Sequence, residues 1–210
     1  MLENIFVLNH SSIKIKSSKI IYFDPFKVGK SYNDADYIFI THSHYDHYSE
    51  EDINKVRKNE TKIIVTRDLK ENVEKLGFDN SNILLVEPNE KYIIDTLKIE
   101  TIPAYNVGKK FHPKSNKWVG YILEISDKKY YVAGDTDITE ENKKIKCDVA
   151  FLPIGGTYTM NYEEAAHLAN IINPKIVVPT HYGSIIGTNE DADKFAKLLN
   201  KKIICEIKLK

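Results

Sequence analysis

Short apolar runs separated by polar turn residues dominate the pattern along this chain of 210 residues. Runs of four to eight residues rich in Ile, Val, Tyr and Phe are typical of β-strands. The continuous apolar run at residues 37–41 has the character of a strand buried on both faces. The predicted strands cover residues 4–8, 12–16, 19–23, 37–41, 62–66, 82–86, 91–94, 97–103, 118–125, 129–133, 150–153, 175–180 and 202–207.

Helical periodicity is confined to a few segments. Ser49 followed by three acidic residues is typical of an N-cap and first turn, and predicts a helix to about residue 58. Apolar spacing predicts further helices at residues 67–76, 162–172 and 190–199. In each half of the chain the strands come first and the helices follow. This order favours two sheets packed face to face with helices outside over one alternating parallel sheet.

Length and composition indicate one domain over residues 1–210. Hydrophobic residues make up 42% and charged residues 29%, which excludes a disordered chain. Thirty basic residues balance thirty acidic ones, so charge does not favour nucleic acid as a partner. No apolar run reaches the ~20 residues of a membrane span, and the run at residues 5–8 is too short for a signal peptide. With Cys147 and Cys205 as the only cysteines, we expect a cytoplasmic protein with inert thiols.

Four potential metal ligands lie within six residues directly after the predicted strand at residues 37–41: His42, His44, Asp46 and His47. Residues two apart on an extended chain point to the same side, so the first two histidines can share one metal ion. The aspartate and the last histidine follow in the turn and can reach a second ion. Imidazole and carboxylate together suit zinc, manganese or iron. A bound cation also removes the repulsion that three protonated histidines would have.

Two further candidates follow predicted strands in the second half. Asp135 lies in the sequence AGDT, where a carboxylate could bridge two cations with its two oxygens. His181 lies in the sequence PTHYG. Taken alone, the first motif is more often a turn, and a single histidine after a strand is more often structural. Together with the cluster at residues 42–47, both favour a metal site.

These motifs, in this order, resemble those of the metallo-β-lactamase superfamily. Within it, the chain looks like the small stand-alone hydrolases related to L-ascorbate-6-phosphate lactonase. The resemblance implies an α+β fold, a four-layer αββα sandwich with a dinuclear metal site at one edge. It implies that His42 and His44 bind the first metal ion and that Asp135 bridges to the second. The remaining ligands of the second ion would be Asp46, His47 and His181.

The resemblance extends to the N-terminal part of the chain and leaves one ligand open. His10 is a candidate for the rim of the site, and Asp24 for a turn or for support of a ligand. The superfamily places a third histidine just after the strand expected at residues 97–103, where this chain has Asn106. An amide oxygen is a poor zinc ligand beside imidazole. We therefore expect His112 to be the ligand. The alternative is a first metal ion short of one protein ligand, with His112 contacting substrate.

Two segments beyond the ligands are candidates for substrate binding. Residues 108–117 hold four lysines, which favours either an anion-binding loop that uses Lys109 and Lys110 or a solvated loop in a lysine-rich chain. A glycine turn before Tyr158 could bring that residue to the mouth of the site, although it lacks the nucleotide-binding loop pattern. His167 is expected on a helix surface or in packing.

The sequence thus predicts a metal-dependent hydrolase of a small anionic ester, either a phosphodiester or a lactone. Two divalent cations, zinc before manganese or iron, would supply hydroxide as the nucleophile. Asp46 and Asp135 are the expected catalytic carboxylates. An RNA-processing nuclease of the same superfamily is the first alternative, and balanced charge counts against it. A non-catalytic or redox metal-binding protein is the second. The sequence leaves the oligomeric state open and favours no membrane partner.

Overall fold

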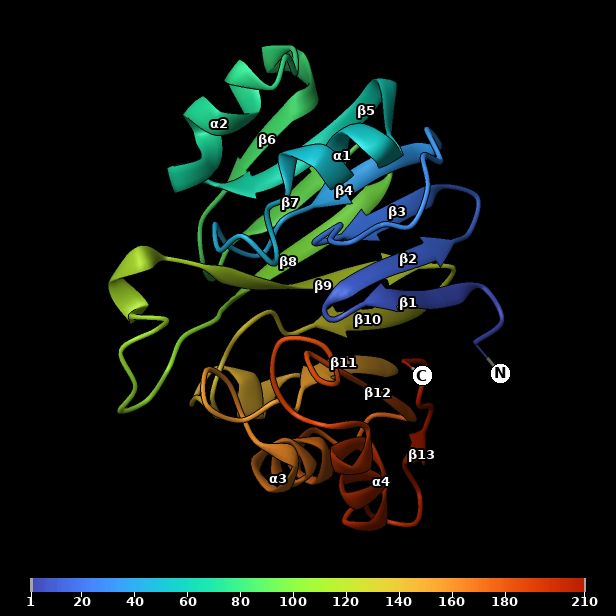
Figure 1. The fold of residues 1–210 in the computed structure, drawn as a ribbon, viewed down its shortest axis with the longest axis vertical. Coiled ribbons are helices and arrows are strands. Elements are labelled where there is room, and N and C mark those ends of the chain that lie inside the picture. The colour runs from blue at the N-terminus through green and yellow to red at the C-terminus, as the bar shows by residue number, and fades with distance from the viewer. Residues whose placement is uncertain (1, 210) are drawn as a thin grey trace. The chain divides into compact units, whose positions relative to one another are not determined.

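The computed structural model describes residues 2–209. The chain divides into two compact units, one ending at Glu87 and the other beginning at Pro88. Each unit contains one β-sheet and its own helices (Figure 1). The single domain expected from chain length stays a prediction.

The first unit is built on a six-stranded sheet whose strands lie in chain order. Its first three strands pair antiparallel, and the pairs from the third strand to the sixth are parallel. The strands are β1 (Ile5–Asn9), β2 (Ser12–Lys16), β3 (Ile20–Phe23), β4 (Ala35–Phe39), β5 (Arg57–Thr66) and β6 (Ile83–Val86). The helical segments are α1 (Glu50–Val56), η1 (Arg67–Leu69), α2 (Lys70–Lys75) and η2 (Asn80–Asn82).

The second unit is built on a seven-stranded sheet in the order β13-β12-β11-β10-β9-β8-β7. The pairs from β7 to β10 are antiparallel, and those from β10 to β13 are parallel. The strands are β7 (Lys91–Ile94), β8 (Leu97–Pro103), β9 (Val119–Ile125), β10 (Lys128–Val132), β11 (Val149–Pro153), β12 (Ile176–Thr180) and β13 (Ile204–Cys205). The helical segments are η3 (Lys114–Asn116), η4 (Asn142–Lys144), α3 (Tyr162–Ile172) and α4 (Asn189–Lys197).

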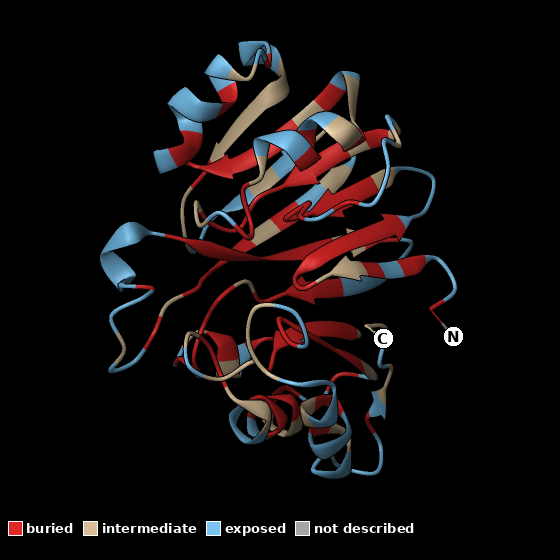
Figure 2. Cartoon of the chain, viewed as in Figure 1, coloured by how far each residue is buried: buried red, intermediate tan, exposed pale blue. Residues whose placement is uncertain are grey.

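Each unit packs its helices on one face of its own sheet. In the first unit, Ile53 of α1 belongs to the same apolar cluster as Ile38 of β4. In the second, Leu168 of α3 and Phe195 of α4 pack in one cluster with Leu152 of β11. Figure 2 shows the alternation that results, with buried residues along the strands and exposed residues on the outer sides of the helices. Burial of each such side chain contributes about 1.5–3 kcal/mol.

A capping residue determines where α1 begins. Ser49 accepts a hydrogen bond from the Asp52 N–H and so ends the loop that carries the histidine cluster. The Asp52 carboxylate in turn accepts the backbone N–H groups of Lys27 and Val28 at 2.8 and 3.0 Å. These bonds tie α1 to the segment that follows β3. The predicted start of this helix is confirmed.

The predicted elements are found, with differences at their ends. The helix expected to reach residue 58 ends at Val56, and β5 begins at once because Arg57 already pairs with Ala35 of β4. The strand expected at residues 202–207 is wrong in length. It is reduced to Ile204–Cys205, because only these two residues pair with β12 at the sheet edge.

Two mixed sheets, each with its own helices, confirm the α+β class. Within residues 2–209, no helix combines the length and the apolar character needed to cross a bilayer.

Candidate metal centre

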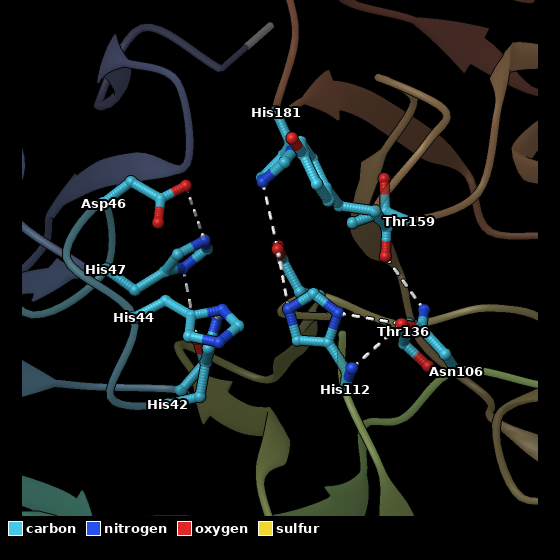
Figure 3. Close-up of polar contacts among 12 residues, drawn as sticks. His42, His44, Asp46, His47, Asn106, His112, Thr136, Thr159 and His181 are labelled. Carbon is cyan, nitrogen blue, oxygen red and sulfur yellow. Dashed lines mark hydrogen bonds and ion pairs between the residues drawn. The ribbon is translucent and has the colours of Figure 1, made fainter. Parts of the chain in front are cut away.

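The histidine cluster of the first unit lies at the C-terminal end of the parallel strand β4. After that strand the chain turns sharply, with the N–H groups of His47 and Tyr48 both donating to the carbonyl of His44 at 3.0 and 2.8 Å. This turn folds the cluster onto itself. The ring nitrogens His42 Nε2 and His44 Nδ1 lie 3.1 Å apart, as expected for two side chains that share one side of the chain (Figure 3).

Asp24 organises this cluster from the end of β3. Its carboxylate accepts the N–H of Thr41 at 2.8 Å, the hydroxyl of Thr41 at 2.7 Å and Nδ1–H of His47 at 2.7 Å. Because Asp24 is buried, the pKa of its carboxyl is raised, against the opposing effect of His47. The Thr41 hydroxyl proton is used by Asp24, so Thr41 Oγ1 accepts from Nδ1–H of His42 at 3.0 Å. In the neutral rings of His42 and His47, Nε2 is therefore the nitrogen that carries a lone pair.

His10 contacts the cluster from the hairpin between β1 and β2. It has a positive φ of 49° and is fully buried, at 0% exposed. Its Nε2 lies 3.3 Å from Oδ2 of Asp46. The same carboxylate oxygen is 3.6 Å from Nε2 of His47 (Figure 3). His10 is thus an inner neighbour of Asp46 rather than an exposed rim residue.

The second unit brings together three residues that are far apart in sequence. His112 Nε2 and His181 Nε2 lie 3.2 and 3.0 Å from the same oxygen, Oδ2 of Asp135, and all three side chains are buried (Figure 3). Asp135 follows β10 and His181 follows β12, which flank β11 in the parallel part of the sheet. Parallel strands end at the same edge of a sheet, so the topology itself brings these two residues together.

Glycine at position 155 is required for this arrangement. A Cβ there would collide with the carbonyl oxygen of His181 and with the side chain of Ile186 at 2.6 Å. The glycine turn therefore allows the chain after β11 to pass close to His181. The sequence pattern showed the turn but gave no sign of this contact.

Asn106, at the position where a third histidine ligand is expected, is hydrogen-bonded to His112. Its Oδ1 accepts two hydrogen bonds from His112, from the backbone N–H and from ring Nδ1–H, each at 3.0 Å. Its Nδ2 donates to the carbonyl of Tyr158 at 2.9 Å. Of the two residues considered for the third ligand, His112 is the one that faces Asp135.

The candidate substrate-binding residues have different surroundings. Lys109 Nζ is held by Oδ1 of Asp137 at 2.6 Å and by the carbonyl of Thr159 at 2.7 Å. Lys110 is exposed. The Tyr158 ring meets Phe111 edge-on at 4.7 Å between centroids. The lysine-rich loop is thus attached to the turn after β11 through Lys109, while Lys110, Lys114 and Lys117 are exposed.

The remaining candidates lie outside these clusters. His167 is exposed on α3, as expected for a helix-surface residue. Both cysteines are free thiols, and burial raises the pKa of Cys147 and of Cys205 to about 12. Such thiols are protonated at neutral pH, which agrees with the expectation that they are inert.

The residues of both units fit divalent metal ions. Imidazole nitrogens and carboxylates are the ligands that zinc, manganese and iron take in proteins. In addition, Thr41, Asp24 and Asn106 each accept the Nδ1–H of one histidine. An oxygen partner on one ring nitrogen, with the other left to bind, is typical of metal-ligating histidine.

Comparisons with known proteins agree with this chemistry. Residues 4–181 match the model of the beta-lactamase superfamily domain. A UPF0173 metal-dependent hydrolase from Thermococcus onnurineus is 30% identical over 208 residues, covering 93% of this chain and 91% of the relative. Another, from Pyrococcus horikoshii, is 31% identical over 210 residues with the same coverage.

Solved structures confirm the metallo-β-lactamase fold. A crystal structure from Parabacteroides distasonis has a TM-score of 0.84 and 32% identity, covering 98% of this chain and 93% of that one. Igni18, a metallo hydrolase from Ignicoccus hospitalis, has a TM-score of 0.76 at 23% identity and supports the fold alone, over 97% of this chain and 93% of its own. The chain therefore belongs to the metallo-β-lactamase superfamily, as an enzyme of its UPF0173 metal-dependent hydrolase group.

Proposed function

We propose that this enzyme hydrolyses a small anionic ester, a phosphodiester or a lactone, with two divalent metal ions. Zinc is the first choice of metal, and manganese and iron are the alternatives. One observation carries the proposal. Two buried imidazoles, His112 and His181, direct Nε2 at one oxygen of the buried Asp135 carboxylate. A carboxylate between two imidazoles is the donor set expected of a metal-bridging residue.

The ligand assignment draws on both units. His42, His44 and His112 would hold the first ion, and Asp135 would be shared between the two ions. Asp46, His47 and His181 would hold the second. Support for combining the units comes from the order of these residues in the superfamily, and support for each half comes from its own geometry. Two ions held by these residues would lower the pKa of a bound water molecule and polarise the ester.

The protein's own groups then have defined tasks. Asp135 provides negative charge that offsets the repulsion between two cations. Asp46 would accept a hydrogen bond from an attacking water molecule and so orient it. Its Oδ2 is itself positioned by His10 at 3.3 Å. Asp24 and Asn106 hold the rings of His47 and His112 in the tautomer that leaves Nε2 to bind.

Binding of the substrate's charge falls to the loop after β8 and the turn after β11. Lys110 is exposed and is the nearest lysine in sequence to His112 that has no ion pair among the described contacts of the second unit. Lys109 has its charge offset by Asp137, so we assign it the lesser share of anion binding. Tyr158 lies in the turn after β11. Hydrogen bonds from Asn106 and Lys109 join this turn to the loop after β8.

Metal analysis with matched histidine variants tests the proposal. Protein purified without added zinc should hold about two transition-metal ions per chain, and chelation should abolish hydrolysis of bis(p-nitrophenyl) phosphate or of a lactone from a small panel. His181→Ala should lose metal, whereas His167→Ala, the same change at an exposed position on α3, should not. Protein that binds no metal on titration would overturn the proposal. Bound iron without hydrolysis of any ester would favour the redox alternative.

A further inference from the structure

The loop between β8 and β9 carries His112, which lies nine residues after the end of β8 at Pro103. Asn106 and His112 lie six residues apart in this loop, yet they are joined by three hydrogen bonds. The Asn106 N–H donates to the carbonyl of His112 at 2.8 Å. The Asn106 Oδ1 accepts the His112 N–H and Nδ1–H, each at 3.0 Å. Both residues are buried, at 7% and 1% exposed.

The orientation of the Asn106 amide follows from partners that have only one role. A backbone N–H can only donate, so the atom that faces the His112 N–H is the amide oxygen. A backbone carbonyl can only accept, so the atom that faces the Tyr158 carbonyl at 2.9 Å is the amide nitrogen. Two independent contacts therefore agree on the same assignment.

This orientation determines the tautomer of His112. Since the amide oxygen can only accept, the ring nitrogen 3.0 Å away must carry the proton. The lone pair of the neutral ring is then on Nε2, the atom that lies 3.2 Å from Oδ2 of Asp135. In the opposite tautomer the Nδ1 lone pair would face the amide oxygen, so this hydrogen bond of the buried ring would be lost.

We infer that Asn106 is the positioning residue that presents His112 to the metal site. It lies where a ligand is expected, and it acts through the histidine six residues away. It sets the ring's tautomer and direction. Its Nδ2 also ties the loop to Tyr158, so the position of the ligand is coupled to the turn that carries the candidate substrate contact. This inference rests on the proposed metal-dependent function.

A double-mutant cycle tests the inference through metal affinity. Zinc dissociation constants are measured by competition with a chromophoric chelator for the wild type, Asn106→Ala, His112→Ala and the double variant. Asn106→Ala should weaken zinc binding about 10–100-fold. In the His112→Ala background the same change should have an effect of less than about 2-fold, because the residue through which it acts is gone. Asn116→Ala, an exposed change in the same loop, should leave affinity unaltered.

A spectroscopic readout separates positioning from general support of the fold. Long-range ¹H–¹⁵N NMR spectra of the wild type should show His112 protonated at Nδ1, and Asn106→Ala should lose this preference. Asn106→Asp keeps an acceptor oxygen, so it should retain the tautomer and most of the zinc affinity. It should also release Tyr158, since it lacks the amide donor. This variant carries the test if the alanine variant fails to fold.

The outcomes distinguish the inference from the function beneath it. Unchanged zinc affinity and tautomer in Asn106→Ala, or losses that add in the double variant, would overturn the inference alone. Loss of the Nδ1–H tautomer in Asn106→Asp would do the same. A wild type that binds no metal would overturn the proposed function together with this inference.

Discussion

The two units obtain their candidate ligands in opposite ways. The first takes four of them from residues 42–47, one short turn after β4. The second takes three from positions 112, 135 and 181, which follow three different strands. In the first unit the backbone turn does the positioning, and in the second the strand order does. Local sequence therefore determines one half of the candidate ligand set, and sheet topology determines the other.

The supporting residues differ as well. In the first unit a buried carboxylate, Asp24, holds His47 by a hydrogen bond of 2.7 Å. In the second a neutral amide, Asn106, holds His112 at 3.0 Å. A hydrogen bond to a carboxylate is stronger than one to a neutral amide, so more stabilisation of the ring is lost when Asp24 is removed. We therefore expect the first unit to tolerate changes to its support less well than the second.

Removing the negative charge of Asp135 in the second unit should have the largest effect on metal binding and hydrolysis. Asp135→Asn keeps the size of the side chain but removes the carboxylate that we propose to bridge the metal ions. We expect the metal content to fall toward one ion per chain and hydrolysis to fall by more than about 100-fold, beyond the effect of a supporting residue. Asp193→Asn, exposed on α4, is the control. Near wild-type turnover of Asp135→Asn on a confirmed substrate would refute the bridging role.

The two cores can be compared by equivalent truncations. Ile53→Ala in the first unit and Leu168→Ala in the second each remove a side chain that is 0% exposed. Each should lower the free energy of unfolding by about 2–5 kcal/mol, measured by urea denaturation. Leu198→Ala, at a leucine that is 46% exposed, should change it by less than about 0.5 kcal/mol. Equal stability of Leu168→Ala and Leu198→Ala would contradict the assigned core.

The effect of removing Asp24 in the first unit can be compared with that of removing Asn106 in the second. Asp24→Ala leaves His47 Nδ1–H and the Thr41 hydroxyl without their shared acceptor. Zinc affinity should fall about 10–100-fold, and by more than in Asn106→Ala, when both are titrated against the same chelator. Asp79→Ala, an exposed aspartate of the same unit, should bind zinc like the wild type. A smaller loss in Asp24→Ala than in Asn106→Ala would reverse the comparison.

Helix caps offer a milder contrast between the units. Asn161 caps α3 with two accepted N–H groups, in a capping box with Glu164. Ser49 accepts one N–H at the start of α1, at 3.3 Å. Asn161→Ala should cost about 1 kcal/mol of stability and Ser49→Ala about 0.5 kcal/mol. Thermal melting of both variants under the same conditions measures the difference, and a larger loss at Ser49 would show that its bond to the Asp52 side chain matters more than the cap.

The smallest effect concerns an ion pair of the second unit and depends on pH. The hydrogen bond from Lys114 lowers the pKa of Glu141 from 4.5 to about 2. A lowered pKa means that the pair stabilises the folded state above about pH 4.5, and that this contribution is lost as the pH falls toward 2. Glu141→Gln should therefore cost less than about 1 kcal/mol at pH 7, and the difference from wild type should shrink at pH 3. A difference that grows on acidification would refute this assignment.

Much of this protein could be predicted from local sequence. The strands, the helix start at Ser49 and the histidine cluster at residues 42–47 depend on neighbours a few positions away, which is the range that periodicity and capping rules cover. The ends of elements depend also on partners distant in the chain. The last strand shrinks to Ile204–Cys205 because its length depends on pairing with β12 and not on its own apolar content.

The tertiary structure decided what depends on residues distant in sequence. Asp135 and His181 meet because β10 and β12 flank β11, and no spacing rule carries that information. Asn106 proved to be the partner of His112 through bonds that span six residues of irregular loop, where no periodic pattern exists to read. His10 contacts Asp46 from the turn between β1 and β2, which belong to the same sheet as β4. Sequence determined which chemistry the chain carries, and the three-dimensional structure determined which side chains hold it in place, because such contacts are made between elements and not within them.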